Sequence, residues 1–323
     1  MRLRCASDAT DSVRHRLEYL AVRLVQQVVR VLPWRVVHAC GTLLGWAFYV
    51  LDRPHRRMAI VNLQAAFPLR SHEECRTIAR GTFAHFGRLL VELLKFSALA
   101  PDRILARVEF DGRDRVEHAL AQGRGVLLFT GHFGFWEQHA LGHALGVQPM
   151  SVVARALDNP LLHDMLERVR TSTGNAVIYR RGGLRRIRRA LQSNQIVAML
   201  IDQHMQAADA VYVEFFNRPA ATTSAVAALA IRTGAPVIPA FALPIGSGRY
   251  KLIYEHPVEP PRPDDPDPAR EFTQRCTDVL EMYVRRYPEL WLWMHRRWRD
   301  VDAGAAATRG MFPVATQDTD NEI

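Results

Sequence analysis

The chain has 323 residues, enough for a substantial hydrophobic core in one large domain, alone or with an appendage. Hydrophobic residues make up 48% and charged residues 23%, which excludes a disordered chain and a wholly membrane-embedded one. The net charge is +9, and because the only lysines are Lys95 and Lys251, nearly all of the positive charge is arginine. Arginine binds phosphate and carboxylate groups bidentately, so nucleic acid, an anionic membrane and an acidic protein are all candidate partners.

The four cysteines, Cys5, Cys40, Cys75 and Cys276, are scattered and show no zinc-site spacing. Such usage is typical of a reducing compartment and argues against a disulfide framework or a structural metal. Residues 1–11 are polar and lack the pattern of a signal peptide, so we predict a flexible N-terminus there.

Two segments near the N-terminus favour contact with a membrane. Val13, Leu17, Leu20, Leu24, Val28 and Val31 recur at steps of three and four. They predict an amphipathic helix, which lies either in a membrane interface or against its own domain. Val36–Leu51 has sixteen residues without Asp, Glu, Lys or Arg, fewer than the roughly 20 of a comfortable membrane span. Because aromatic residues and arginines flank it, we interpret it as a re-entrant or tilted membrane segment, with a buried core helix as the alternative.

The next part of the chain changes from a connection to a helix. Residues 52–71 have the character of a linking segment, with Phe67 and Pro68 as a break. Ser71 followed by Glu74 is a capping-box pattern and predicts the start of a helix that continues to Leu94. We assign residues 12–100 to a helical, membrane-associating region.

From about Val108 the sequence alternates between short apolar runs and amphipathic stretches. The predicted strands are Gly125–Thr130, Met150–Ala154, Ala176–Tyr179, Ile196–Ile201, Val237–Leu243 and Tyr250–Tyr254. The predicted helices are Asn159–Thr171, Leu184–Gln192, Thr223–Thr233 and Glu271–Tyr287. Continuous apolar runs are typical of strands covered on both faces, so we predict an α/β fold with a mixed, mostly parallel sheet flanked by helices. This domain spans residues 101–299, and we predict that residues 300–323 are a disordered tail.

The end of the first predicted strand carries a candidate base. Thr130 and Gly131 break the strand, and His132 follows where the chain can open a helix. In a continuous helix His132 and Glu137 would lie about 140° apart, so they meet only if His132 precedes the helix. A histidine supported by a carboxylate can act as a general base, whereas a purely structural histidine is the alternative that this pair alone leaves open. Backbone N–H groups at such a helix start can hold an oxyanion or a phosphate.

Several sequence blocks, in a fixed order, resemble a known family. They are Gly131-His132-Phe133-Gly134-Phe135-Trp136-Glu137, Arg155–Pro160, Asp202-Gln203, Phe215–Thr222, Thr233–Val237 and Pro288–Trp298. These blocks are similar to those of the lipid A biosynthesis late acyltransferases (the lauroyl/myristoyl acyltransferases). That family lies within the wider group of glycerolipid acyltransferases with a His-x4-Asp/Glu motif. The resemblance covers residues 15–299.

The resemblance implies how the site works. His132, oriented by Glu137, would deprotonate an acceptor hydroxyl that attacks an acyl thioester carried by acyl carrier protein or CoA. The predicted substrate-binding residues are Gly134, Trp136, Arg155, Asn159, Asp202 and Gln203. Arg155 would bind a phosphate of the acceptor or help to hold the donor, whereas Asp202 has helix capping as its alternative role. The chemistry requires no cofactor and no metal.

Two residues depart from the family pattern. Phe135 stands where the family has asparagine, and Asn217 stands where it has glycine. Neither belongs to the predicted acid–base pair, so we expect any effect to fall on the acceptor pocket.

Two further clusters invite other functions. His139 and His143 lie four residues apart, but the HExxH pattern of zinc enzymes is absent, so we predict no metal there. Six arginines occur close together, namely Arg180, Arg181, Arg185, Arg186, Arg188 and Arg189. They form either a solvated helix face or a site for anions or an acidic carrier protein. The run lacks interleaved aromatic residues, so we predict no nucleic-acid partner.

We therefore predict a membrane-attached bacterial O-acyltransferase at the cytoplasmic face of the inner membrane. Its acceptor would be a lipid A-type glycolipid, and its partners would include anionic membrane lipid. Within the same chemistry, a lysophospholipid or a mannosylated phosphoinositide is the alternative acceptor. A basic membrane-binding protein with an inactive acyltransferase fold is the non-enzymatic alternative, which the presence of both His132 and Glu137 disfavours.

Overall fold

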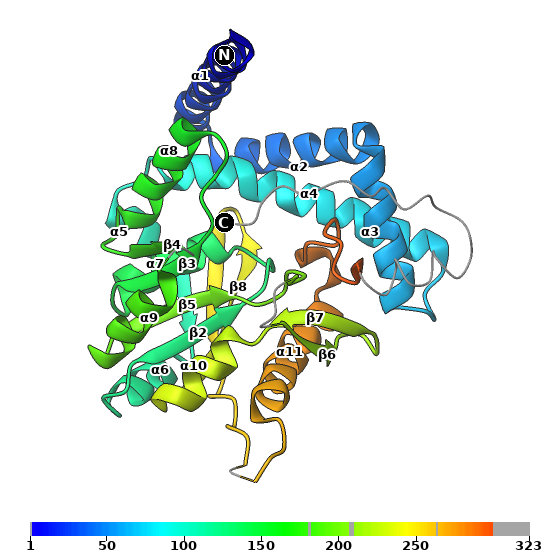
Figure 1. Cartoon of the computed structure of the whole chain (residues 1–323). Coiled ribbons are helices and arrows are strands. Elements are labelled where there is room, and N and C mark those ends of the chain that lie inside the picture. The colour runs from blue at the N-terminus through cyan, green and yellow to red at the C-terminus, as the bar shows by residue number, and fades with distance from the viewer. Residues whose placement is uncertain (1, 180–181, 207–209, 263, 300–323) are drawn as a thin grey trace.

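The computed structural model describes residues 2–179, 182–206, 210–262 and 264–299, with side chains described from Ser12 onward. A group of helices from the first third of the chain lies at one end of a seven-stranded sheet, and further helices cover both faces of that sheet (Figure 1). Residues 2–11, which we expected to be flexible, form the first part of a helix. The predicted tail 300–323 lies outside the described residues.

The N-terminal helices are α1 (Arg2–Val31), α2 (Trp34–Leu51), α3 (Arg53–Ala66), α4 (His72–Phe96) and α5 (Pro101–Leu105). The predicted capping box at the start of α4 is confirmed, because the Ser71 Oγ accepts a hydrogen bond from Glu74 N at 3.2 Å and Glu74 Oε2 accepts from Ser71 N at 2.7 Å. The prediction that residues 52–71 are a connection is wrong. Asp52 caps α3 by accepting from His55 N, and Pro54 is compatible with a first helical turn.

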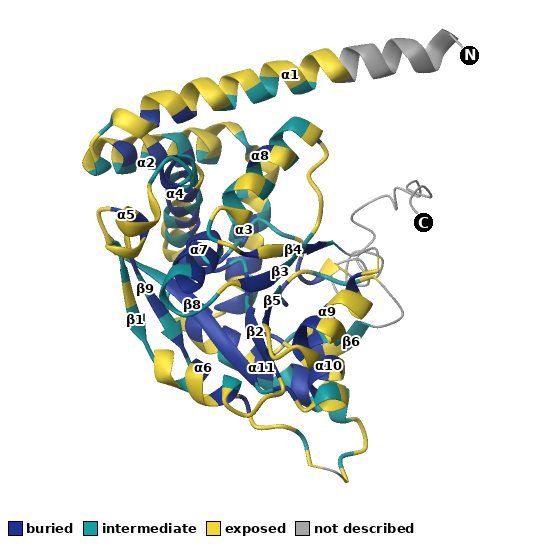
Figure 2. Cartoon of the chain, turned by 90° about the vertical axis from the view of Figure 1, so that its left-hand side faces the viewer, coloured by how far each residue is buried: buried dark blue, intermediate teal, exposed yellow. Residues whose placement is uncertain are grey.

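The helix α1 is held by its polar side and leaves its apolar stripe exposed. The Lys95 ammonium donates to three carbonyl oxygens at the end of α1, those of Val29 at 3.1 Å, Arg30 at 3.3 Å and Leu32 at 2.7 Å. Gln26 donates to Ser97 Oγ at 2.7 Å. Every member of the predicted stripe is exposed, and Figure 2 shows α1 running along the outside of the molecule. The stripe therefore does not pack against its own domain.

The helix α2 packs on α4 through glycines and exposes apolar residues on its other side. Val37, Gly41 and Gly45 are buried, and an added Cβ on Gly45 would overlap the carbonyl oxygen of Phe83 in α4. Leu43 is 61% exposed and Leu51 is 78% exposed. None of the helices within the described residues has the length and apolar character needed to cross a membrane.

The main sheet has the strand order β1-β9-β8-β2-β5-β3-β4. Its strands are β1 (Val108–Asp111), β2 (Val126–Thr130), β3 (Met150–Ala154), β4 (Ala176–Tyr179), β5 (Ile196–Leu200), β8 (Val237–Gly246) and β9 (Arg249–Tyr254). The five strands from β8 to β4 are parallel, whereas β9 is antiparallel to β8 and β1 runs parallel to β9. The predicted mixed, mostly parallel sheet is thus confirmed.

Helices on both faces of the sheet divide the core. The remaining helices are α6 (Arg113–Leu120), α7 (Trp136–Gly146), α8 (Pro160–Thr171), α9 (Gly183–Gln192), α10 (Ala225–Thr233) and α11 (Pro268–Arg286). Along β2, Val126 and Leu128 pack with residues of α6 and α7, whereas Leu127 and Phe129 pack with residues of α9, α10 and α11. This alternation explains the continuous apolar run of β2, since both of its faces are covered.

A two-stranded hairpin that we did not predict lies beside α11. It consists of β6 (Ala210–Glu214) and β7 (Pro219–Thr223), which pair in antiparallel fashion. Phe216 and Asn217 have φ values of 56° and 54°, and Phe215 N donates to Arg218 O at 2.9 Å. Positive φ at both central residues is the signature of a type I′ hairpin turn, which favours glycine or asparagine. Asn217 therefore replaces the family's glycine at a turn, not in a pocket.

The close approach of α2 and α4 gives a stability prediction. Replacing Gly45 with alanine forces a methyl group into the α4 backbone, so we expect the free energy of unfolding to fall by about 1–3 kcal/mol, as for other overpacked cores. Chemical denaturation measures this loss. The matched control is Gly183→Ala, where the new Cβ would lie 3.6 Å from the Ile178 side chain, an ordinary contact. Equal unfolding midpoints for the two variants would contradict the prediction.

Candidate active site

Two neighbouring parallel strands deliver the central pair of the site. β2 and β5 are paired in register with Thr130 opposite Leu200, so both end at the same edge of the sheet. His132 follows β2 by two residues, and Asp202 follows β5 by two residues. In α/β proteins active groups gather beyond the carboxyl ends of such strands. The register therefore places the imidazole and the carboxylate side by side.

The Asp202 carboxylate binds His132 twice and Trp291 once. His132 Nδ1 lies 2.8 Å from Asp202 Oδ1, while Asp202 Oδ2 accepts from His132 N at 2.6 Å and from Trp291 Nε1 at 2.8 Å. Asp202 is only 4% exposed. Since an ionised carboxylate only accepts hydrogen bonds, Nδ1 of His132 carries the proton and Nε2 presents its lone pair.

These contacts shift the pKa values of both Asp202 and His132. Burial alone raises the pKa of Asp202, but the His132 charge and the hydrogen bonds from His132 and Trp291 outweigh it and lower that pKa to about 2. Burial lowers the pKa of His132, but the charge and hydrogen bond of Asp202, with a smaller contribution from Glu137, raise it above its ordinary value. Asp202 is thus ionised at neutral pH, and His132 is a stronger base than a free imidazole.

The loop that carries His132 is fixed by backbone hydrogen bonds to three other segments. Leu292 N donates to His132 O at 3.1 Å, Gly134 N donates to Leu290 O at 2.9 Å, and Phe135 N donates to Ala242 O at 3.0 Å. Gly134 has a φ of 59°, and an added Cβ there would overlap the Ala242 carbonyl oxygen. Gly134 is thus needed for the turn. Its N–H is already used and does not supply the predicted anion contact.

The free side of the His132 ring faces Gln203 and Trp136. Nε2 of His132 lies 3.3 Å from Gln203 Nε2, whose amide N–H can donate to the imidazole lone pair. The Trp136 ring lies 5.1 Å from the His132 ring and packs in turn near Phe86 of α4. Gln203 is exposed and Trp136 is half-buried, so an incoming hydroxyl group can reach Nε2 by displacing the Gln203 amide.

The structure does not pair Glu137 with His132. Glu137 lies in the first turn of α7, where Arg170 of α8 donates to its Oε2 at 3.0 Å through Nε and to its Oε1 through Nη2. His132 precedes the helix, as we expected, but the carboxylate that contacts its ring is Asp202. Glu137 acts on His132 only through its charge. The predicted orienting role therefore falls to Asp202, because adjacent strand ends are closer than the next helical turn.

The block Arg155–Pro160 contains one exposed residue, Arg155, and one residue with a structural role, Asn159. Arg155 is 80% exposed at its side chain and lies 3.7 Å from Asp158, so it remains free to meet an anion. Asn159 is buried and caps α8, with its Oδ1 accepting from Leu161 N and Leu162 N. Its Nδ2 donates to His15 O and to Glu18 Oε2 in α1. These bonds leave no position on the Asn159 amide for the predicted substrate contact.

Phe135, the other departure from the family pattern, is a core residue. It is 2% exposed and packs edge-to-face on Phe96 and Tyr250. Its side chain packs in the core between α4 and β9, so any effect on the acceptor pocket would be indirect.

His139 and His143 are buried core residues. Burial lowers the pKa of His139 to about 4, and burial together with His139 lowers the pKa of His143 well below its usual value. His143 Nδ1 lies 2.7 Å from the Tyr254 hydroxyl. The Nε2 atoms of both imidazoles are buried without a hydrogen-bond partner.

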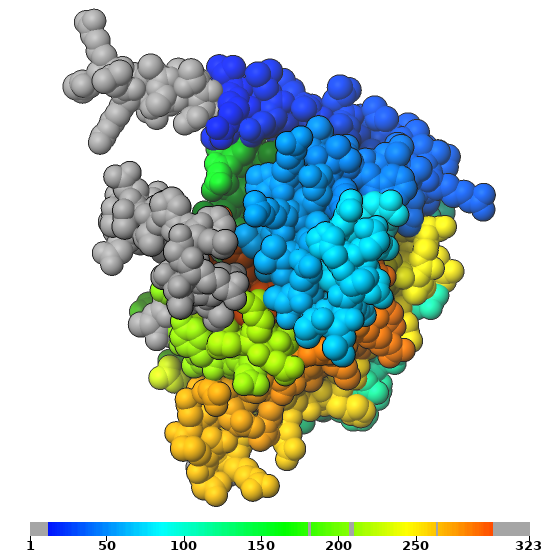
Figure 3. Space-filling view, turned by 90° about the vertical axis from the view of Figure 1, so that its right-hand side faces the viewer, coloured from blue at the N-terminus to red at the C-terminus, as the bar shows by residue number. Residues whose placement is uncertain are grey.

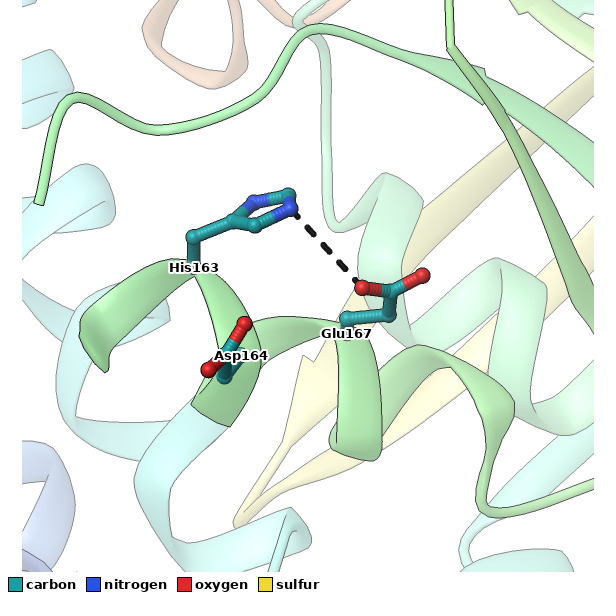
Figure 4. A group of neighbouring side chains, drawn as sticks. All are labelled: His163, Asp164 and Glu167. Carbon is teal, nitrogen blue, oxygen red and sulfur yellow. Dashed lines mark ion pairs between the residues drawn. The ribbon is translucent and has the colours of Figure 1, made fainter. Parts of the chain in front are cut away.

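One other group of potential metal ligands occurs among the described residues, on a single turn of α8. It consists of His163, Asp164 and Glu167 (Figure 4). The His163 Nε2 lies 3.7 Å from Glu167 Oε2, and Asp164 is exposed. The group includes neither His132 nor Asp202.

The arginine run is exposed where the structure describes it. Arg185, Arg186, Arg188 and Arg189 lie on the outer face of α9, whose inner face buries Ile187 and Leu191. Among the described residues no carboxylate forms an ion pair with these four side chains. Arg180 and Arg181 lie outside the described residues. The four arginines thus form an uncompensated positive surface.

Sequence reasoning assigned no role to Trp291 and Arg170. Trp291 lies in the matched block near the C-terminus, but nothing in its spacing connects it with Asp202, 89 residues earlier. Arg170 lies in the last turn of α8 beside Arg168, where either residue would suit a helix C-terminus. Only the three-dimensional contacts distinguish the arginine that binds Glu137.

Comparison with known proteins identifies the family of the chain. The model of the bacterial lipid A biosynthesis acyltransferases matches residues 8–300. The chain belongs to this family. The predicted resemblance is thereby confirmed, and the chain is an acyltransferase. This sets aside the non-enzymatic alternative of an inactive fold.

Individual members of the lipid A biosynthesis acyltransferase family match most of the chain. The lipid A biosynthesis lauroyltransferase of Escherichia coli (strain K12) is 30% identical over 296 residues, 90% of this chain and 94% of the relative. The myristoyltransferase of the same organism is 26% identical, over 76% of this chain and 75% of the relative. The phosphatidylinositol mannoside acyltransferase of Mycolicibacterium smegmatis is 24% identical, over 68% and 72%.

The His132–Asp202 pair makes a prediction about pH. If the neutral form of His132 is the base, kcat/KM should fall as the pH drops through its raised pKa. In Asp202→Asn, burial remains but the anion is lost, so we expect the pKa of His132 to fall and the acidic limb to move to lower pH. We also expect kcat to fall by about 10²-fold or more.

Two controls accompany this pH profile. Glu137→Gln keeps the His132–Asp202 hydrogen bond and should move the acidic limb much less, and Asp114→Asn, on the surface of α6, should not move it. An acidic limb that shifts with Glu137→Gln but not with Asp202→Asn would return the orienting role to Glu137.

Proposed function

We propose that this enzyme transfers a fatty acyl chain from an acyl thioester to a hydroxyl group of a lipid A-type glycolipid, with His132 as general base and Asp202 as its orienting carboxylate. The observation that carries the proposal is the hydrogen bond between His132 Nδ1 and Asp202, which leaves Nε2 unprotonated at the open side of the ring. The names of the E. coli relatives supply the acceptor class and a fatty acyl group.

The proposed reaction has two steps. Nε2 of His132 removes the proton of the acceptor hydroxyl while its oxygen attacks the thioester carbonyl, which forms the new C–O bond and a tetrahedral oxyanion. The oxyanion then collapses, the C–S bond breaks, and the thiolate takes the proton from Nε2. The products are an ester and a free thiol. Asp202 stabilises the imidazolium that exists between the two steps.

Donors for the oxyanion lie beside Nε2. The Gln203 amide, which an acceptor hydroxyl displaces from Nε2, remains close enough to donate to the tetrahedral oxygen. The first-turn N–H groups of α7 are the second source, since a helix N-terminus favours negative charge. The exposed Arg155 is the candidate for a phosphate of the acceptor or of the donor.

The acyl donor would be an acyl carrier protein or CoA, and no cofactor takes part. An acidic carrier protein would dock on the four exposed arginines of α9. The exposed apolar stripe of α1 and the exposed face of α2 would hold the enzyme at the cytoplasmic face of the inner membrane, where anionic lipid meets the positive net charge.

A second acceptor class has a specific observation in its favour. The match to a phosphatidylinositol mannoside acyltransferase extends over 68% of the chain, so a mannosylated phosphoinositide, or a lysophospholipid, would use the same base. Incubation with a labelled acyl thioester and a panel of these acceptors distinguishes the classes, since only the true acceptor gains the label. Labelling of the phosphoinositide or lysophospholipid alone would replace lipid A as the acceptor.

Removal of the base gives the direct test of the chemistry. In His132→Ala we expect acyl transfer to fall by about 10²–10⁴-fold, the usual contribution of a general base, in a protein that still folds. Thioester consumption by the purified protein measures the loss. His118→Ala, on the exposed surface of α6, is the matched control. Turnover within a few-fold of the unchanged enzyme would exclude His132 as the base.

The arginines of α9 give a test of the donor. Replacing Arg185, Arg186, Arg188 and Arg189 with glutamine should raise the KM for an acyl carrier protein substrate and weaken its salt dependence, because exposed charges mainly steer association. The KM for acyl-CoA should change less. Arg232→Gln on α10 is a single-charge control. If the unchanged enzyme and the variant with four glutamines had equal KM values for the carrier-protein substrate at low salt, the arginine run would be only a solvated helix face.

A further inference from the structure

A groove of about 540 Å³ opens between α2, α4 and the end of β8. Figure 3 shows this side of the molecule, with α2 and α4 in blue and cyan and the yellow segment that includes β8 and β9 beside them. The volume falls in the range of sites that hold small molecules. The residues that line the groove include none of those around the His132 ring. The groove is therefore separate from the catalytic site.

One wall of the groove is positively charged. The side chain of Arg88 reaches into it from α4 and donates one hydrogen bond, at 3.2 Å, to the Thr42 hydroxyl. Within the described part of the chain no carboxylate forms an ion pair with Arg88, so most of its five N–H donors remain available. A second guanidinium, that of Arg80, lies 5.9 Å from the centre of the Trp46 ring at the same groove. Guanidinium groups bind phosphate oxygens bidentately.

The carboxylate of Glu92, one helical turn from Arg88 in α4, already contacts two other side chains. Glu92 is 1% exposed, and its Oε1 lies 2.5 Å from His38 Nε2 while its Oε2 accepts from the Tyr250 hydroxyl. His38 itself lines the groove and covers this carboxylate. The charge that the groove presents to a ligand is therefore that of Arg88, with the histidine between the ligand and Glu92.

The rest of the lining is largely apolar and continues onto the exposed apolar surface of α2. Leu43 is 61% exposed and Trp46 is 43% exposed, and Pro244 completes this lining from β8. Ile245, next to it in sequence, is also exposed. A cation beside exposed leucine and tryptophan suits an amphiphile with an anionic head and acyl chains, since tryptophan favours the boundary between headgroups and chains.

We propose that this groove binds the headgroup of an anionic phospholipid of the bilayer, with the phosphate on Arg88 and the acyl chains leaving along Leu43 and Trp46. The inference rests on the proposed function, because it takes the enzyme to work at a membrane. A bound headgroup would fix how far α2 lies from the phosphate plane. It would also give the enzyme a preference for anionic lipid beyond that of its net charge.

Vesicle binding tests the proposal with the whole protein. We expect Arg88→Gln to weaken binding to phosphatidylcholine vesicles that contain phosphatidylglycerol by about five-fold, the contribution of one basic residue near a charged surface. Binding to pure phosphatidylcholine vesicles should not change. Arg88→Lys should restore part of the loss, and Arg232→Gln, with the same charge change on α10, should show less of it. An equal loss for Arg88→Gln and Arg232→Gln would reduce the effect to net charge and overturn the proposal.

Trp46 provides a direct readout of occupancy. Brominated phosphatidylglycerol should quench the tryptophan fluorescence more strongly than brominated phosphatidylcholine, and this difference should disappear in Trp46→Phe. Equal quenching by the two lipids would overturn the proposal. So would a higher KM of Arg88→Gln for the glycolipid acceptor in phospholipid-free detergent, because the groove would then belong to the acceptor.

A comparison variant separates this inference from membrane docking and from catalysis. Leu17→Gln/Leu20→Gln/Leu24→Gln on α1 should weaken binding to both kinds of vesicle, whereas Arg88→Gln should affect only the anionic kind. Because vesicle binding needs no turnover, an inactive enzyme would still show the headgroup preference. Acyl transfer without any headgroup preference would refute this inference alone.

Discussion

The structure of the site depends on one buried carboxylate, that of Asp202. It accepts three N–H groups, two from His132 and one from Trp291, and so joins parts of the chain that are 70 and 89 residues away. A buried acceptor that loses its partners costs about 1–3 kcal/mol, and more when it is charged. Any movement of the loop after β2, which carries His132, or of the block Pro288–Trp298, which carries Trp291, would incur that cost. The orientation of the His132 ring and the position of the block that contains Trp291 are therefore maintained by the same bonds.

Much of the fold could be predicted because its signals are local. Apolar runs predicted β3 and β4 with their observed ends, and a capping box located the start of α4. The hairpin β6–β7 was not predicted, because its turn uses Phe216 and Asn217 instead of glycine. The helix α3 was not predicted, although Pro54 lies in its first turn, where proline is compatible with a helix.

The site was only half predictable, for a topological reason. His132 could be found from its own loop, but its carboxylate partner depends on β5 lying next to β2. In the sequence β3 and β4 intervene between them, so no spacing rule brings Asp202 to His132. Glu137 was the nearest carboxylate along the chain, and Arg170 binds it instead. Likewise, the periodicity of α1 predicted an apolar stripe correctly, but periodicity does not say what that stripe faces.

The helix α8 connects two regions with different environments. Its first residue follows Asn159, whose amide binds His15 and Glu18 of α1, and its last turn carries Arg170, which holds Glu137 beneath the catalytic loop. Twelve residues of helix measure about 18 Å. The helix is thus a spacer of fixed length between the surface that would meet lipid and the base that would act on it. Under the proposed function, its length would set how far an acceptor must rise out of the leaflet before its hydroxyl group reaches His132.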